Sequence, residues 1–92
     1  MGAVVMYVDP ENEGKLFIRD DFVPVKSSAD ILKITIELEN GKLWTIKLKR
    51  KRALMTDGSI TTWWVFEGLA KEVAYVQETL KRWHKEKKIP RI

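Results

Sequence analysis

The chain contains no cysteine and only one histidine, His84. The absence of cysteine excludes disulfides, thiolate nucleophiles and zinc or iron–sulfur sites with Cys ligands. A single histidine excludes a multi-histidine metal site and gives a Ser-His-Asp relay little support. Asp20, Asp21 and Asp30 could contact a hard cation, but no segment supplies about six oxygens at the required spacing. We therefore expect no enzymatic activity and no cofactor.

Long apolar runs are also missing, since none approaches the roughly 18–20 residues that a membrane span needs. The first ten residues, MGAVVMYVDP, are too short and too acidic at their end for a secretory signal. A length of 92 residues, without linker or repeat, is typical of one small domain over residues 1–92. We expect a soluble, cytoplasmic protein with no membrane partner.

The net charge of +4 conceals a strong asymmetry along the chain. Residues 1–41 contain four basic and eight acidic residues, whereas residues 42–92 contain thirteen basic and five acidic ones. This split indicates an anionic partner for the second half or an interface where opposite halves meet. Abundant Lys and Glu without Cys is also typical of thermophilic proteins.

Two short strands are predicted near the N-terminus. The nearly continuous apolar run Ala3–Val8 predicts a strand that is buried on both faces. Turn-forming residues over Asp9–Gly14, the last of them free to adopt positive φ, connect it to a second strand, Lys15–Arg19, with which it pairs. Because Pro24 lacks a backbone donor, Phe22–Val25 belongs at a sheet edge or in a loop.

The clearest strands are Ile31–Glu39 and Lys42–Met55, in which apolar and polar residues alternate. An Asn-Gly pair between them normally indicates a two-residue loop, but that register would mix the two faces. A three-residue loop that ends at a left-handed Gly41 pairs Ile36 with Trp44 and aligns all the apolar partners. The bulged turn is therefore predicted.

The same reasoning applies to the next strand, Ile60–Glu67. A three-residue loop that ends at a left-handed Gly58 pairs Lys51 with Trp63 and keeps the faces separate. Residues 31–67 are thus predicted to form a three-stranded meander with one apolar face and one face that carries a basic stripe.

After Gly68 the apolar period changes from 2 to about 3.6, which predicts one amphipathic helix over residues 69–88. Pro90 then leaves a basic tail at residues 89–92. We expect an α+β fold in which an antiparallel sheet of about five strands carries this long helix on one face. The predicted apolar stripe of the helix consists of Leu69, Val73, Val76, Leu80 and Trp83.

The segment Lys47–Arg52 contains five basic residues among six. On a strand, Lys47, Lys49 and Lys51 face away from the helix, with Lys33 opposite Lys47, whereas the two arginines face the helix side near the strand end. A solvated strand that resists edge-to-edge pairing is the simpler alternative. The candidate nucleic-acid-binding residues are Lys33, Lys47, Lys49, Arg50, Lys51, Arg52 and Trp63.

Trp63 strengthens the functional interpretation because the register places it beside these lysines on the open face. Bases of a single strand stack on such a ring, each stacked base contributing about 1–3 kcal/mol, while lysines contact phosphates. Burial in a homodimer interface is an equal alternative for Trp63. The other tryptophans, Trp44, Trp64 and Trp83, are predicted to be core residues.

The layout over Ile31–Glu67 and Leu69–Lys88, with the stripe Lys47–Arg52 and the Trp63-Trp64 pair, resembles small sheet-plus-helix single-stranded DNA-binding proteins. These include the Whirly type and the archaeal ThermoDBP-related proteins. The resemblance implies sequence-tolerant single-strand binding by an oligomer, although the acidic N-terminal half has no place in that pattern.

We therefore expect non-enzymatic binding of single-stranded DNA or RNA by a homo-oligomer. The alternative is an interaction or assembly module whose basic strand meets an acidic surface on a partner or on another copy.

Overall fold

The structure, a computed structural model, describes residues 4–23, 25 and 27–87. Five antiparallel strands form one open sheet in the order β1-β2-β5-β4-β3, with a helix that follows the last strand. This confirms the predicted α+β fold, while Lys88 and the predicted tail at residues 89–92 lie outside the described residues. The elements are β1 (Met6–Asp9), β2 (Asn12–Arg19), β3 (Ile31–Glu37), β4 (Leu43–Leu54), β5 (Ile60–Glu67) and α1 (Ala70–Glu86).

Both hairpins of the meander have the predicted register. Gly41 and Gly58 adopt φ angles of 83° and 85°, the left-handed conformation that a three-residue bulged loop requires. All the predicted pairs between β3 and β4 are present, and Lys51 pairs with Trp63 across the second hairpin. The alternation of apolar residues therefore fixed the register correctly.

The prediction for the first strand was partly wrong. β1 pairs with β2 as expected, but it is an edge strand and is not buried on both faces. Met6 and Val8 pack against the main core, whereas Tyr7 is partly exposed and stacks on Phe17 on the opposite side. The residues of this run are all apolar because the edge strand makes apolar contacts on both of its faces. The first residue of the predicted range lies outside the described residues.

Gly14 has a different role from the predicted one. It lies in β2, where a side chain is excluded because an added Cβ would be 2.5 Å from the carbonyl oxygen of Gly68. The Gly68 amide donates to the Gly14 carbonyl at 2.8 Å. This close approach joins the start of β2 to the junction between β5 and α1.

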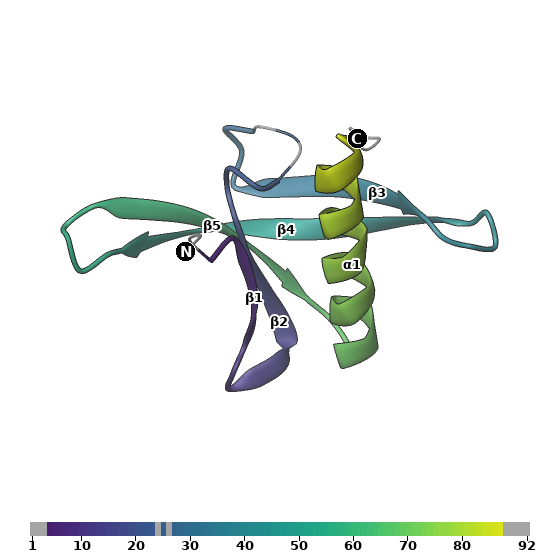
Figure 1. Cartoon of the computed structure of the whole chain (residues 1–92), viewed down its shortest axis with the longest axis horizontal. Coiled ribbons are helices and arrows are strands. Elements are labelled where there is room, and N and C mark those ends of the chain that lie inside the picture. The colour runs from purple at the N-terminus through teal and green to yellow at the C-terminus, as the bar shows by residue number, and fades with distance from the viewer. Residues whose placement is uncertain (1–3, 24, 26, 88–92) are drawn as a thin grey trace.

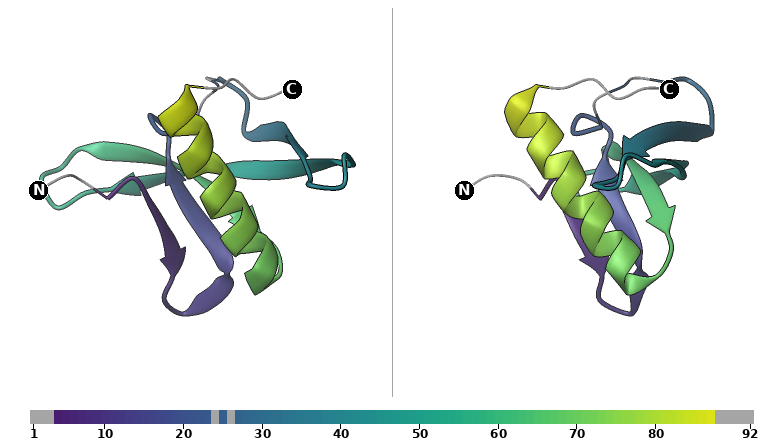
Figure 2. Two further views of the ribbon diagram at one scale, coloured as in Figure 1. Left: turned by 45° about the vertical axis from the view of Figure 1, so that its right-hand side comes forward. Right: turned by 90° about the vertical axis from the view of Figure 1, so that its right-hand side faces the viewer.

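The helix covers one face of the sheet, as the apolar stripe predicted. Figure 1 shows α1 crossing β3 and β4 steeply, and both views in Figure 2 show it on a single side of the sheet. The core between them excludes water almost completely, which provides the main stabilising term. Its buried residues are Leu16, Ile18, Val23, Leu32, Ile34, Ile36, Ile46, Leu48, Trp64, Phe66, Val73, Val76, Leu80 and Trp83.

The start of the helix differs from the prediction. Leu69 is the N-cap residue and is exposed, so it does not belong to the apolar stripe. Its amide donates to Glu72 Oε1 at 2.7 Å, which satisfies one of the free donors of the first turn. Leu69 has the spacing of the apolar stripe but precedes the first helical residue, and a capping residue need not face the core.

A two-stranded arm projects from one end of the sheet (Figure 1, left). β3 pairs with β4 only as far as Lys49, and β2 pairs with β5 only from Trp63. Residues 52–54 and 60–62 consequently have strand partners only in each other, and a backbone hydrogen bond from outside the hairpin runs from the Asp20 amide to the Thr62 carbonyl at 3.0 Å. We call residues 52–62 the arm. The hairpin between β3 and β4 lies at the opposite end of the molecule's 45 Å long axis.

Candidate nucleic-acid interface

A row of exposed lysines crosses the face of the sheet that lies away from α1. Lys33 on β3 is directly opposite Lys47 on β4, and Lys49 and Lys51 follow at alternate positions along β4. β-strand geometry separates such alternate residues by about 6.5–7 Å. The predicted grouping of these four lysines on one face is confirmed, and we call it the lysine row.

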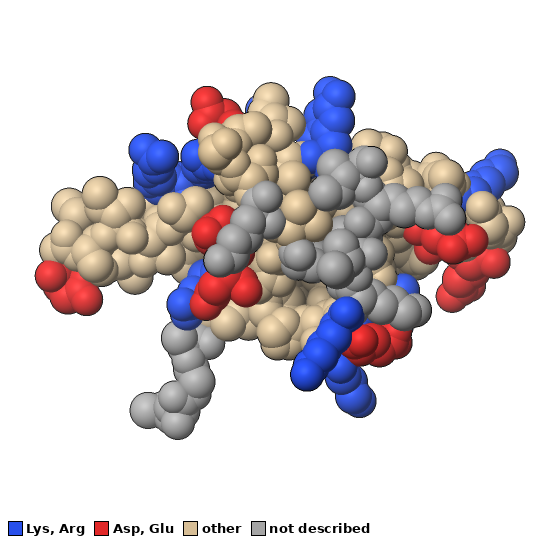
Figure 3. Space-filling model, turned by 90° about the horizontal axis from the view of Figure 1, so that it is seen from above, with Lys and Arg blue, Asp and Glu red and all other residues tan. Residues whose placement is uncertain are grey.

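The positive charges of the lysine row are not paired with negative charges of the described residues. Like charges that face each other across a ladder destabilise a sheet, as Lys33 and Lys47 do here. None of the four lysines forms an ion pair with a carboxylate of the residues that the structure describes. Figure 3 shows several Lys and Arg side chains along its upper margin, the side away from α1, with acidic side chains also visible there. A row of this kind favours an anionic ligand.

The predicted exposure of Trp63 was wrong. Its side chain is on the expected face, but only 9 % of it is exposed, because β1 and β2 lie beside it. Tyr7 contacts it edge-on with ring centroids 5.3 Å apart, and Phe17 and Val65 complete a small buried cluster. Lys51 Nζ lies 5.4 Å from the Phe17 ring centroid, so its stem lies along this cluster. Trp63 is therefore a buried packing residue under this face and is not exposed to a ligand.

Tyr7 is the aromatic residue that this face offers to solvent. Its ring is stacked on Phe17, with centroids 5.0 Å apart and planes within 4° of each other, and 37 % of the residue is exposed. Tyr7 is not among the residues predicted to bind, because it lies in an apolar run and far from the lysines along the chain. Only the pairing of β1 with β2 and of β2 with β5 brings it next to Trp63.

Arg50 and Arg52 do not join the lysine row. Arg50 lies on the helix side, where its guanidinium donates to the Ser27 carbonyl at 2.6 Å and lies 5.2 Å from the Trp64 ring centroid. These contacts hold Arg50 in a structural position. Arg52 is exposed on the same side, on the arm. Both arginines therefore point to the side predicted, but the structure separates them from the four lysines.

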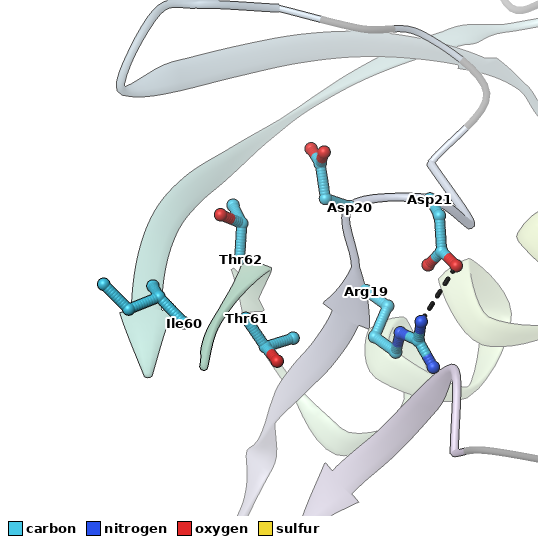
Figure 4. Close-up of a pocket in the computed structure, with 6 residues that line it drawn as sticks. All are labelled: Arg19, Asp20, Asp21, Ile60, Thr61 and Thr62. Carbon is cyan, nitrogen blue, oxygen red and sulfur yellow. Dashed lines mark hydrogen bonds and ion pairs between the residues drawn. The ribbon is translucent and has the colours of Figure 1, made fainter. Parts of the chain in front are cut away.

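A shallow hollow of about 340 Å³ lies between the end of β2 and the arm (Figure 4). Asp20 accepts a hydrogen bond from Trp64 Nε1 at 2.8 Å, and Asp21 pairs with Arg19 at 3.0 Å. Figure 4 shows the two carboxylates pointing away from each other. Across the described residues there is no group of three potential metal ligands. The hollow thus has no arrangement that would hold a cation.

A second depression, about 500 Å³ in volume, lies between the β3–β4 hairpin and the start of α1. Trp44, predicted as a core residue, is only half-buried and forms its floor. The Trp44 ring lies edge-on to Phe66 and Tyr75, at centroid distances of 5.9 and 6.3 Å. We call this depression the groove. It is lined by Leu38, Trp44, Lys71, Glu72 and Tyr75.

Comparison of the chain with protein-family models, with curated proteins and with solved structures gives no match. The resemblance to single-stranded DNA-binding proteins thus stays an expectation. Among the described residues, no helix has the length and apolar character needed to cross a membrane. Any function must be inferred from the chemistry of the surfaces described above.

Proposed function

We propose that this protein binds single-stranded nucleic acid on the open face of its sheet, without catalysing a reaction. The observation that carries the proposal is the lysine row, in which Lys33 and Lys47 face each other and neither forms an ion pair with a carboxylate in the described part of the chain. Repulsion between these ammonium groups is relieved when a phosphate lies between them. Relief of this repulsion, which destabilises the free sheet, adds to the affinity for the ligand.

The spacing of the row suits an extended polyanion. Lys47, Lys49 and Lys51 alternate along β4, so the points where their side chains leave the strand follow one line at a repeat of about 6.5–7 Å. Consecutive phosphates of an extended single strand have a comparable spacing. Lys33 broadens the line on the β3 side. Such contacts read the backbone and not the base sequence, which makes the binding sequence-tolerant.

Tyr7 supplies the second component. Its stacked position on Phe17 fixes the ring orientation before a ligand arrives, so little conformational entropy remains to be lost on binding. Stacking of a base on an exposed ring is favourable for all four bases. The combination of a lysine row with a preorganised aromatic ring is typical of sheet-based recognition of single strands.

A duplex fits this face less well. Most duplex-reading domains insert a helix into the major groove, but α1 lies on the opposite side of the sheet from the lysine row. A base that stacks on Tyr7 must also be unpaired and accessible. These two features favour a single strand as the ligand.

The proposal is tested by titrating a fluorescent mixed-sequence single strand and measuring anisotropy at several salt concentrations. Four phosphate contacts predict that log K falls against log salt with a slope of about −3, from roughly −0.7 per contact. The double variant Lys47→Gln/Lys49→Gln should reduce the slope by about 1.4. Duplex DNA of the same sequence should bind more weakly, and single-stranded RNA should bind comparably.

The matched control is Lys81→Gln/Lys85→Gln, which removes the same charge from exposed positions of α1. It should leave the slope unchanged. Polyglutamate provides a second control, because it has negative charge without bases. Equal affinity for polyglutamate and the single strand would contradict the proposal and favour an acidic protein surface as the partner. Failure to bind the single strand at low salt would also contradict it.

A further inference from the structure

The tip of the arm exposes apolar side chains that nothing in the described chain covers. Leu54 and Ile60 face each other across the hairpin and are 77 % and 67 % exposed, and Met55 beside them is also exposed. Figure 3 shows this arm as a mostly uncharged projection at the left. Contiguous apolar surface on a projecting element usually marks an interaction site.

The groove provides the complementary shape at the other end of the molecule. Its apolar lining is formed by Leu38, Trp44 and Tyr75, and it is open to solvent. Leu54, Ile60 and Trp44 occupy positions of the same parity in the ladder of β3, β4 and β5. The arm and the β3–β4 hairpin beside the groove lie at opposite ends of the molecule's long axis.

We propose that the arm of one copy of this chain occupies the groove of a second copy. The charges around the two surfaces support this occupant. Arg52 lies next to Leu54 on the docking side of the arm, and Glu72 lies at the rim of the groove. The tip also carries Asp57, and Lys71, next to Glu72 at the start of α1, also lines the groove. Each apolar surface is therefore bordered by charges that the other can neutralise.

Asp57 is suited to such a contact because its carboxylate is exposed at the tip and held there by Ser59. Hydrogen bonds from the Ser59 hydroxyl and amide to its carboxylate lower the pKa of Asp57 below its ordinary value. The same bonds hold the three-residue turn that positions the tip. A fixed negative charge at the tip opposes contact with phosphates and favours the lysine at the groove rim.

The positions of the arm and groove predict how the assembly closes. A one-way contact between two copies leaves one arm free on one copy and one groove free on the other, whereas a two-fold dimer fills both grooves. A single hairpin tip is also small compared with stable interfaces, which bury roughly 1,200–2,000 Å². Two reciprocal contacts double the area. We therefore expect a two-fold dimer that exchanges arms, and this does not depend on the proposed nucleic-acid binding.

The absence of cysteine permits a direct test by disulfide trapping. Leu54→Cys and Leu38→Cys chains, each with a different mass tag, are mixed and oxidised mildly. The mixed disulfide between arm and groove should dominate over either symmetric product. Leu43→Cys is the matched control, because Leu43 is exposed at the same hairpin end but on the opposite face. Equal trapping with Leu43→Cys would overturn the proposal.

Sedimentation provides a second measurement that needs no crosslink. The wild-type chain should sediment as a dimer, and the exposed-site variant Leu54→Gln/Ile60→Thr should dissociate with a dissociation constant roughly 100-fold higher. Both positions are exposed, so the variant should retain its fold by circular dichroism. A wild-type monomer at the highest soluble concentration, or a variant as dimeric as the wild type, would overturn the proposal. The salt slope for single-strand binding reports separately on the lysine row.

Discussion

The two faces of the sheet use the same kinds of residue for different purposes, and the neighbouring residues Trp63 and Trp64 show this directly. Trp64 faces α1, is fully buried, and donates its indole N–H to Asp20. Trp63 faces the other way, into a small cluster beside the lysine row. One face therefore holds the main core, while the other combines a small apolar cluster with exposed positive charge.

The largest expected effect separates these two tryptophans. Trp64→Ala should lower the free energy of unfolding by about 3–5 kcal/mol, because it leaves a closed cavity and an unpaired Asp20. Trp63→Ala should cost roughly 2 kcal/mol, since its cluster can relax toward solvent. Urea denaturation measures both.

Trp64→Phe serves as the control, because it removes the hydrogen bond but retains an aromatic ring at the site. Its cost should lie between zero and that of Trp64→Ala. If Trp63→Ala proved as destabilising as Trp64→Ala, the two faces would not differ in the way proposed.

The next effect concerns binding and is confined to the open face. Tyr7→Leu should weaken the affinity for a single strand by about 1–3 kcal/mol, the value of one stacked base. Tyr7→Phe keeps the ring on Phe17 and should bind as the wild type does. Anisotropy titration at low salt measures both variants. Unchanged affinity for Tyr7→Leu would remove Tyr7 from the interface and leave the lysine row alone.

The smallest effect has opposite signs for stability and binding. Lys47→Glu replaces a repulsive pair with Lys33 by an attractive one and should stabilise the fold by about 0.2–1 kcal/mol. The same change should weaken single-strand binding. Lys49→Glu is the matched control, because Lys49 is directly opposite Ile31 and Val65 and so relieves no direct like-charge pair. Thermal unfolding at low salt should show the larger stabilisation for Lys47→Glu.

Local patterns predicted the parts of the fold that depend on neighbouring residues along the chain. The alternation around Gly41 and Gly58 predicted both hairpin registers, because a one-residue slip would have turned apolar side chains to solvent. The same registers placed the four lysines on one face. The apolar period of the helix also predicted its buried side chains correctly, with the exception of Leu69. Spacing alone does not distinguish a capping residue from a core residue.

The errors arose where distant segments meet. Trp63 was predicted to be exposed, because the meander alone leaves its face open. Pairing of β2 with β5 and of β1 with β2 brings Phe17 and Tyr7 against it. Arg50 similarly finds the Ser27 carbonyl in a loop whose path no strand pattern predicts. Such contacts depend on the order of strands in the sheet, and several orders are compatible with the same periodicity.

The sequence by itself determined the fold class, the two bulged turns, the apolar stripe of α1 and the charge of the open face. These follow from periodicity and backbone sterics, which act over a few residues. Only the tertiary structure decided that Trp63 is covered, that Tyr7 is the exposed ring, and that an apolar arm and a groove lie at opposite ends. Strand order and strand length set these features, because they determine which side chains remain without a neighbour.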